Sequence, residues 1–133
     1  MATLVDSSVL IAAERGQLDL DRILETHADT GLAMAAVTAS ELLHGVHRLR
    51  TSARKTRAEA LVEALLQAMP VVAFDILCAR AHARLGADLA RRGVSVGAHD
   101  LLIGATAVSG GFSVATRDRR GFSKIPDLDV VYW

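Results

Sequence analysis

The chain has 133 residues and a mass of 14.1 kDa, which is the usual size of one domain. We therefore predict that residues 1–133 form one domain. Hydrophobic residues make up 51% and charged residues 23% of the chain, a balance that excludes intrinsic disorder. Its 15 basic and 15 acidic residues cancel, so binding to nucleic acid or anionic lipid would need a local patch of charge.

Cellular location can be predicted from cysteine content and apolar runs. The single cysteine, Cys78, cannot close an intrachain disulfide, and the first residues lack the basic segment and apolar stretch of a signal peptide. No apolar run reaches the roughly 20 residues that a membrane span needs. We expect a soluble protein of the reducing cytoplasm, with no membrane partner.

Short apolar strands alternate with amphipathic helices along the chain. Strands are predicted, in chain order, at 2–5, 32–37, 71–74, 112–115 and 130–132. Helices are predicted at 7–13, 18–27, 38–49, 51–69, 75–92 and 98–109. Thr38 and Glu41 fit a capping box at the start of the helix at 38–49. Pro70 ends the helix at 51–69, and Asp75 has the position of an N-cap for the helix at 75–92. This alternation predicts an α/β fold with a central parallel sheet between two layers of helices.

Four acids lie where a strand gives way to a helix or loop, or in the first turn of a helix. They are Asp6, Glu41, Asp100 and Asp118. In a parallel sheet the carboxyl ends of the strands share one edge, so we expect these side chains to converge there. Clustered carboxylates repel one another and raise their pKa values unless a cation joins them, and oxygen ligands favour Mg²⁺ or Mn²⁺.

Each acid taken singly has a plainer interpretation. Asp6 fits an N-cap, Glu41 the second half of the capping box, Asp100 a first-turn acid and Asp118 a turn former. Independent caps and turns, however, have no reason to converge on one edge of a sheet. The convergence of all four is therefore what favours a site.

The order of these motifs resembles the PIN-domain nucleases, and within them the VapC-type ribonuclease toxins of bacterial toxin-antitoxin pairs. The resemblance rests on Leu4-Val5-Asp6-Ser7-Ser8-Val9-Leu10-Ile11, Ser40-Glu41-Leu42-Leu43-His44-Gly45, Asp100-Leu101-Leu102-Ile103-Gly104-Ala105-Thr106-Ala107 and Val114-Ala115-Thr116-Arg117-Asp118-Arg119-Arg120-Gly121-Phe122. It runs nearly end to end and implies a PIN-like fold. The chain departs from the family at Gly104, where an alanine is common, and at Gly121, where many members carry a further acid.

The resemblance also implies roles for individual residues. The acids named above fall on the family's acidic positions, which hold one or two divalent ions. Thr116 falls on its hydroxyl position, and Ser8 on the small polar residue after the first acid. Attack by water on a phosphodiester needs a deprotonated nucleophile and stabilised oxygen charge, which carboxylate-held Mg²⁺ supplies. We assign Asp6 and Asp100 as principal ligands and the other two acids as supporting ligands or water-orienting groups; the resemblance leaves Mn²⁺ open beside Mg²⁺.

Arginines near the last acid are candidates for binding RNA. Arg117, Arg119 and Arg120 flank Asp118, where guanidinium groups would meet a substrate phosphate, and Ser8 is assigned to the same RNA-binding set. A second basic stretch covers 48–57, for which a solvated helix face and RNA contact stay open.

The sequence thus predicts a Mg²⁺-dependent endoribonuclease that acts as a toxin, is a homodimer and is neutralised by a cognate antitoxin protein. Two alternatives remain at this point. One is a housekeeping RNA-processing nuclease of the same fold. The other is a catalytically silent PIN-like module that binds RNA or protein, against which the presence of all four acids argues.

Overall fold

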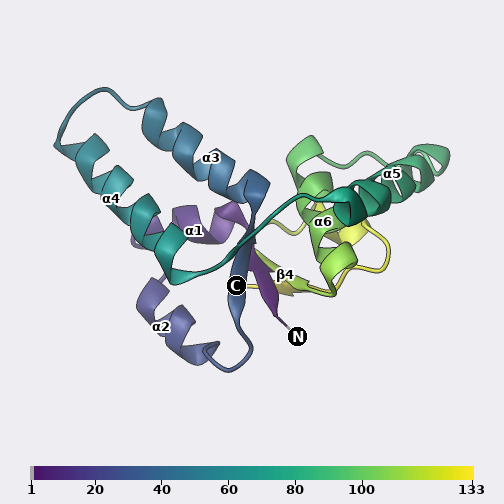
Figure 1. Ribbon diagram of the computed structural model, residues 1–133, viewed down its shortest axis with the longest axis horizontal. Coiled ribbons are helices and arrows are strands. Elements are labelled where there is room, and N and C mark those ends of the chain that lie inside the picture. Colours follow the sequence, from purple (N-terminus) through teal and green to yellow (C-terminus); the bar gives the residue numbers. More distant parts are fainter. Residues whose placement is uncertain (1) are drawn as a thin grey trace.

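A computed structural model describes residues 2–133, and its centre is a sheet of five strands in which every neighbouring pair is parallel. The strands are β1 (Thr3–Val5), β2 (Leu32–Ala35), β3 (Val71–Val72), β4 (Ser113–Thr116) and β5 (Val130–Tyr132). Their order across the sheet is β3-β2-β1-β4-β5. Figure 1 shows this sheet between two groups of helices.

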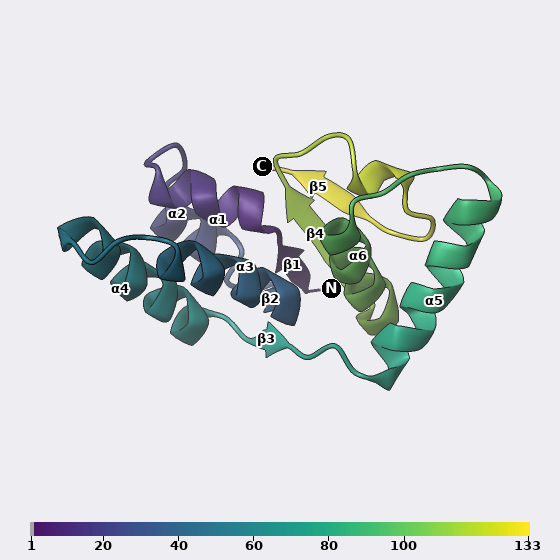
Figure 2. The same ribbon diagram turned by 90° about the horizontal axis from the view of Figure 1, so that it is seen from above.

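Helices cover both faces of the sheet. They are α1 (Ser7–Glu14), α2 (Leu20–Thr26), α3 (Ala36–His47), α4 (Ala53–Ala68), α5 (Ile76–Arg91) and α6 (Ala98–Gly110), followed by a 3₁₀ turn, η1 (Phe122–Lys124). Seen from above, α1 to α4 lie on one side of the strands and α5 and α6 on the other (Figure 2). The predicted three-layer α/β/α fold is therefore confirmed. None of the helices formed by residues 2–133 is long and apolar enough to cross a membrane.

Alternate strand residues supply two apolar cores. Leu4 and Val114 pack in the core that α5 and α6 cover, whereas Val5 and Met34 pack in the core shared with α1, α3 and α4. Successive side chains of a strand point to opposite faces, so a strand buried on both faces must be apolar at every position. The continuous apolar run at the start of the chain satisfies that requirement. Cys78 is buried and unpaired.

The start of α3 differs from the sequence prediction. β2 ends at Ala35, which pairs with Val72, and the chain turns into α3 at Ala36. Thr38 is therefore inside the first turn, and within residues 2–133 its buried Oγ1 has no hydrogen-bond partner. The predicted capping box is wrong, because the strand ends two residues early and the helix takes its N-cap from Ala35. Glu41 consequently lies in the second turn of α3.

Other helix starts follow the local sequence. Asp75 is the N-cap of α5, and its carboxylate accepts the backbone N–H of Cys78 at 2.9 Å. That hydrogen bond favours the ionised form and lowers the pKa of Asp75. Ser52 caps α4 in the same way by accepting the N–H of Lys55. Each cap satisfies a backbone N–H group that the first turn of its helix would otherwise leave unpaired.

The order of strands reverses at β1. The chain adds β2 and then β3 on one side, and then crosses to β4 and β5 on the other. The carboxyl ends of β1 and β4 are therefore neighbours, with Val5 paired to Ala115. A crevice at such a reversal is where open α/β sheets bind ligands. Asp6 follows β1 at this point and Thr116 ends β4.

Candidate active site at the carboxyl ends of the strands

Asp6 is buried at the strand reversal and is held by two hydroxyls. It occupies the N-cap position of α1, but its side chain makes no capping hydrogen bond. Its Oδ2 instead accepts hydrogen bonds from Ser8 Oγ at 2.7 Å and from Thr116 Oγ1 at 2.9 Å. Asp6 is only 6% exposed. The interpretation of this acid as a helix cap is thereby excluded.

The same two hydroxyls fix the loop that follows β4. Ser8 Oγ accepts the backbone N–H of Arg117 at 3.1 Å, and Thr116 Oγ1 accepts that of Asp118 at 3.0 Å. Each hydroxyl thus joins the carboxylate of Asp6 to a backbone amide of the loop. Asp118 also forms a turn, since its Oδ1 accepts the N–H of Arg120 at 2.9 Å. The turn-forming interpretation of Asp118 holds, and it places this acid beside β1 and β4.

Glu41 reaches the site from α3 and is held by two residues that the sequence analysis did not single out. Its Oε2 accepts a hydrogen bond from Ser7 Oγ at 3.0 Å. Its Oε1 lies 3.3 Å from Nδ1 of His99, within ion-pair range but not aligned as a hydrogen bond. Within the described part of the chain, this buried oxygen has no hydrogen-bond donor. The only signal available in the sequence was adjacency, because Ser7 follows Asp6 and His99 precedes Asp100.

Asp100 joins the other acids from the first turn of α6. Burial, as the largest cause, and then the negative charges of Asp6, Asp118 and Glu41 together raise its pKa to about 6, while His99 opposes the shift. His99, the residue before Asp100, lies 3.3 Å from Glu41, and a side chain at Gly121, close to Asp118 in the sequence, would collide with the Asp100 carboxylate. Together with the hydroxyls that join Asp6 to the Asp118 loop, these contacts bring the four predicted acids to one edge of the sheet.

Gly121 and Gly104, the two positions where the sequence departs from the pattern that it resembles, are glycine because neighbouring side chains lie close to them. A Cβ on Gly121 would collide with Oδ2 of Asp100, so the absence of a side chain leaves room for that carboxylate. A Cβ on Gly104 would lie 2.6 Å from Cδ1 of Ile125, which packs against α6 at that point. At both glycines, the space that a side chain would fill is taken by a neighbouring side chain, and at Gly121 this neighbour is an acid of the site.

We predict that Gly121→Ala lowers catalytic activity about 10-fold or more while the fold persists. Gly121 has φ −83° and ψ −60°, a conformation open to alanine, so the added methyl acts by displacing the Asp100 carboxylate. Misplacing a catalytic group by about 1 Å costs on the order of 10²-fold in rate. Initial cleavage rates and a thermal melt test this. Gly45→Ala, where a Cβ would meet no atom within 4 Å, is the control, and equal activity of the two variants would contradict the prediction.

The arginines near Asp118 are partly engaged by the end of the chain. Nη1 of Arg117 donates to the backbone carbonyl of Trp133 at 3.3 Å, and the guanidinium of Arg119 lies 4.4 Å from the centroid of the Tyr132 ring. Arg120 is exposed and contacts Asp118 through its backbone. The three arginines therefore line the rim beside β5 without forming one fork over the acids.

The donor set suits a divalent cation. Between residues 2 and 133, none of the four acids forms a salt bridge with lysine or arginine, so their charge lacks a strong internal counterion. The buried Oε1 of Glu41, which has no hydrogen-bond donor among the described residues, and the raised pKa of Asp100 also indicate a lack of positive charge at this site. No three acidic, histidine or cysteine side chains of the described residues are already arranged around one ion.

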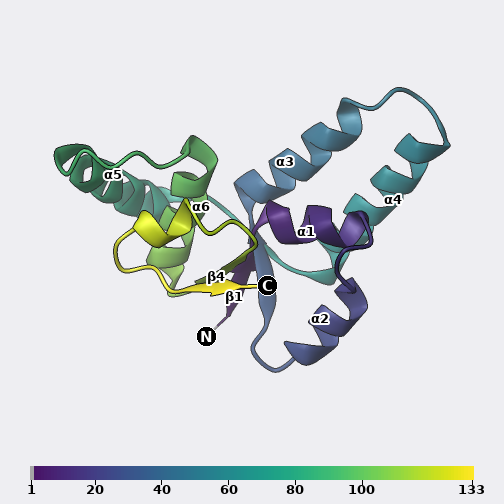
Figure 3. The same cartoon turned by 180° about the vertical axis from the view of Figure 1, so that it is seen from behind.

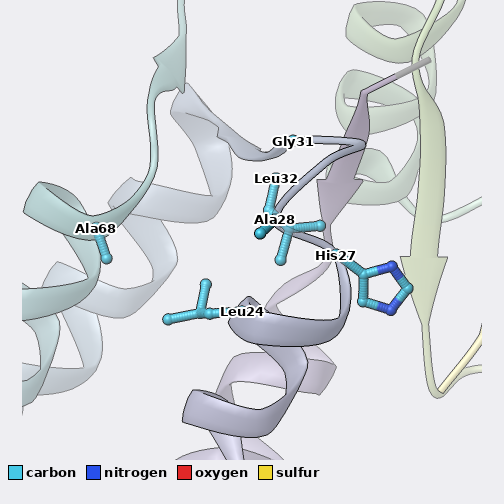
Figure 4. Close-up of a pocket in the computed structure, with 6 residues that line it drawn as sticks. All are labelled: Leu24, His27, Ala28, Gly31, Leu32 and Ala68. Atoms are coloured by element: carbon cyan, nitrogen blue, oxygen red, sulfur yellow. The ribbon is translucent and has the colours of Figure 1, made fainter.

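A hollow in the surface lies away from the acids. It measures about 320 Å³ and is lined by Leu24, His27, Ala28, Gly31, Leu32 and Ala68. Figure 4 shows it between the end of α2, the start of β2 and the end of α4, with the His27 ring turned away from Ala68. That ring stacks on Trp133, with centroids 4.4 Å apart. The hollow is at the amino end of β2, on the opposite edge of the sheet from the acids, and it has no carboxylate.

Comparison with known proteins identifies the family. The family model of the PIN domain matches residues 3–128. Ribonuclease VapC1 of Rickettsia felis is 30% identical over 132 residues, which is 98% of this chain and 96% of the relative. The tRNA(fMet)-specific endonuclease VapC of Salmonella typhimurium is 30% identical over 102 residues, covering 77% of this chain and 75% of the relative.

Solved structures agree with the sequence relatives. The VapBC2 complex of Rickettsia felis, bound to a DNA fragment from its promoter, superposes with a TM-score of 0.90 over 100% of this chain and 99% of that chain, at 23% identity, and so supports the fold. VapBC-5 of Mycobacterium tuberculosis, a member of the VapBC family of toxin-antitoxin systems, has a TM-score of 0.77 and 31% identity over 98% of this chain and 96% of its own. The resemblance seen in the sequence motifs is confirmed: the chain belongs to the PIN-domain family and, within it, to the VapC ribonucleases.

Proposed function

We propose that this protein is a Mg²⁺-dependent endoribonuclease and the toxin of a toxin-antitoxin pair, with residues 1–133 forming one PIN domain. The observation that carries the proposal is the convergence of Asp6, Glu41 and Asp118 on Asp100, in a chain of the VapC family. Four carboxylates with no lysine or arginine partner are costly unless a cation balances them. A bound divalent ion would balance these charges and supply the catalysis.

The acids divide into two roles. Asp6 and Asp100 are the principal metal ligands, and Glu41 and Asp118 are supporting ligands or orient the attacking water. Thr116 and Ser8 are auxiliaries that hold Asp6 through their hydroxyl hydrogens. When bound, Mg²⁺ lowers the pKa of water and stabilises charge on the phosphate oxygens. Mn²⁺ has the same preference for oxygen ligands and would serve in place of Mg²⁺.

The protein's own groups prepare the site before any substrate arrives. The two hydroxyls keep Asp6 in one orientation and tie the Asp118 loop to α1, so two acids cannot move independently. Ser7 and His99 do the same for Glu41. Arg117, Arg119 and Arg120 stand on the rim where a substrate phosphate would pass, and guanidinium groups suit that contact. Hydrolysis by water leaves a 5′-phosphate and a 3′-hydroxyl.

The proposed partners are RNA, a cognate antitoxin protein and a second copy of the chain. Support for the antitoxin comes from relatives solved as VapBC complexes. An arginine or lysine of the antitoxin would pair with Asp6 and Asp100 and take the electrostatic role of the metal. Support for a homodimer comes from exposed apolar side chains at the end of β3 and the start of α5, which are Val71, Phe74, Ile76 and Leu77. We place this activity in the cytoplasm, where both the RNA and the single reduced cysteine are expected.

Growth arrest in a bacterial host tests the toxin role. We expect expression of the wild-type chain alone to arrest growth, and co-expression of the reading frame immediately upstream of its gene to restore it. Asp6→Asn should be harmless without any antitoxin, because the substitution keeps the shape of the side chain and removes its charge. If the wild-type chain and Asp6→Asn arrest growth equally, catalysis is not the cause and the binding-module alternative takes over. If the wild-type chain cleaves RNA but is not toxic, the housekeeping nuclease is favoured.

A further inference from the structure

The far end of the α3–α4 hairpin is strongly basic. We define the basic arm as Arg48, Arg50, Arg54, Lys55 and Arg57. These residues occupy the end of α3, the connecting loop and the first turns of α4, and all but the half-buried Lys55 are exposed. The chain has no acid between Glu41 and Glu59. In Figures 1 and 2 the hairpin points away from the sheet, with its loop at one extremity of the molecule.

The charge of the basic arm is not neutralised by the protein. Throughout residues 2–133, none of its five side chains forms a salt bridge. Three of the four arginines of α5 and its C-cap differ in this respect, because Arg84 pairs with Asp127 at 3.7 Å and both Arg91 and Arg92 pair with Asp88. In a chain whose total charge is zero, the arm is therefore a local excess of positive charge that an external polyanion would meet first.

Helix α3 connects the basic arm to the candidate active site. Glu41 lies in the middle of α3 and Arg48 follows the last residue of this helix. The two are seven positions apart, or about 10 Å along the helix axis. A strand of RNA with one phosphate at the acids would have other phosphates several nucleotides away at the arm, since stacked nucleotides advance by about 3.4 Å. Between Glu41 and Met69 the sequence has no phenylalanine, tyrosine or tryptophan. The arm is therefore suited to binding phosphates, and it offers no large aromatic side chain on which bases could stack.

We propose that the basic arm is a second RNA-docking surface, which binds the phosphate backbone several nucleotides from the bond that is cut. This inference rests on the proposed ribonuclease function and specifies its substrate class. The enzyme favours long or structured RNA over short oligonucleotides, and the arm contributes affinity without reading sequence. Loss of the arm raises KM for long RNA and leaves hydrolysis of a minimal diester unchanged, since such a diester cannot span the distance.

The test is the triple variant Arg50→Gln, Arg54→Gln, Arg57→Gln. Its matched control is Arg80→Gln, Arg84→Gln, Arg91→Gln, which removes the same charge from exposed positions of α5. Binding of labelled bulk transfer RNA is measured with both triple variants in an Asp100→Asn background, so that cleavage does not interfere. At about 0.15 M salt we expect the arm variant to bind on the order of 10- to 100-fold more weakly, and its log–log salt slope to fall by about 2 to 3. The control should change binding less than threefold.

Kinetics with the catalytic acids intact separate the arm from the chemistry. The substrates are bulk transfer RNA and bis(p-nitrophenyl) phosphate, a diester with no further phosphates. We expect the arm variant to have a higher KM for transfer RNA with kcat kept, and a normal rate with the small diester. Equal losses of RNA affinity in the arm and control variants would overturn the proposal. Normal RNA binding together with lost antitoxin binding would also overturn it, by assigning the arm to the protein partner. Failure of the wild-type chain to cleave RNA would instead remove the proposed function.

Discussion

Asp100→Asn should reduce RNA cleavage by on the order of 10³-fold or more, the largest effect that we expect from one substitution. The amide keeps the size of the carboxyl group but lacks the charge that a divalent ion needs, and the loss falls on the transition state rather than on substrate binding. Initial rates with bulk transfer RNA measure the effect, and circular dichroism checks the fold. Asp21→Asn is the matched control, because Asp21 is also a first-turn acid, of α2. Cleavage retained by purified Asp100→Asn would remove our assignment of the site.

The same variant should make the metal-free fold more stable at neutral pH. The pKa of Asp100 is raised from its ordinary value of 3.8 to about 6, so the folded state binds this proton more tightly than the unfolded state does. The free energy of unfolding of the wild-type protein therefore falls as pH rises from about 4 to about 6 through this group. Asp100→Asn removes that decrease. Urea unfolding in EDTA at pH 4.5 and pH 7 measures the difference, and an unchanged pH dependence would contradict the raised pKa.

Removal of divalent metal should abolish cleavage by the wild-type protein and lower its melting temperature. A ligand that binds only the folded state stabilises it by mass action, by about 2.7 kcal/mol at a concentration of 100 Kd. Thermal melts with EDTA, Mg²⁺ and Mn²⁺ measure the stabilisation, and cleavage assays under the same conditions measure activity. Zn²⁺ should substitute poorly, because it prefers nitrogen and sulfur ligands.

Stabilisation by Mg²⁺ also tests whether the carboxylates are the metal ligands. Asp100→Asn should lose most of the stabilisation by Mg²⁺, whereas Asp21→Asn should keep it.

The cleavage products identify the nucleophile. Cleavage that resists EDTA and leaves a 2′,3′-cyclic phosphate would show that the 2′-hydroxyl, rather than water, attacks the phosphorus. Such a product would refute the mechanism even if the acids proved essential.

The arrangement of the acids could be predicted because it depends on topology. Once the strands are parallel, the residues that follow β1 and β4 must meet at one edge, and this requires no knowledge of side-chain rotamers. Asp6 and Asp118 are placed by that rule alone. Asp100 needed the additional assumption that α6 begins at the same edge, which Figure 3 shows from behind. The fold was accessible for the same reason, since the strands and helices differ in period and length.

Features that depend on pairing and side-chain direction could not be predicted in the same way. Thr38 and Glu41 match the capping box in spacing, but the end of β2 is set by the pairing of Ala35 with Val72, residues far apart in the chain. Similarly, the hydrogen bond from Ser7 to Glu41 joins positions 34 residues apart, so no local pattern contains it. Local signals fail where a distant strand decides the boundary.

A chain with zero net charge is not electrostatically inert when its charges are sorted by position. Here four acids lie at the carboxyl edge of the sheet, whereas the basic arm lies at the end of a hairpin. Near the isoelectric point of about 7.0, no overall repulsion between net charges keeps copies of the molecule apart. Low-salt buffers at neutral pH should therefore promote head-to-tail association, arm to acids. Salt near 0.15 M shortens the Debye length to about 8 Å and should disperse these aggregates.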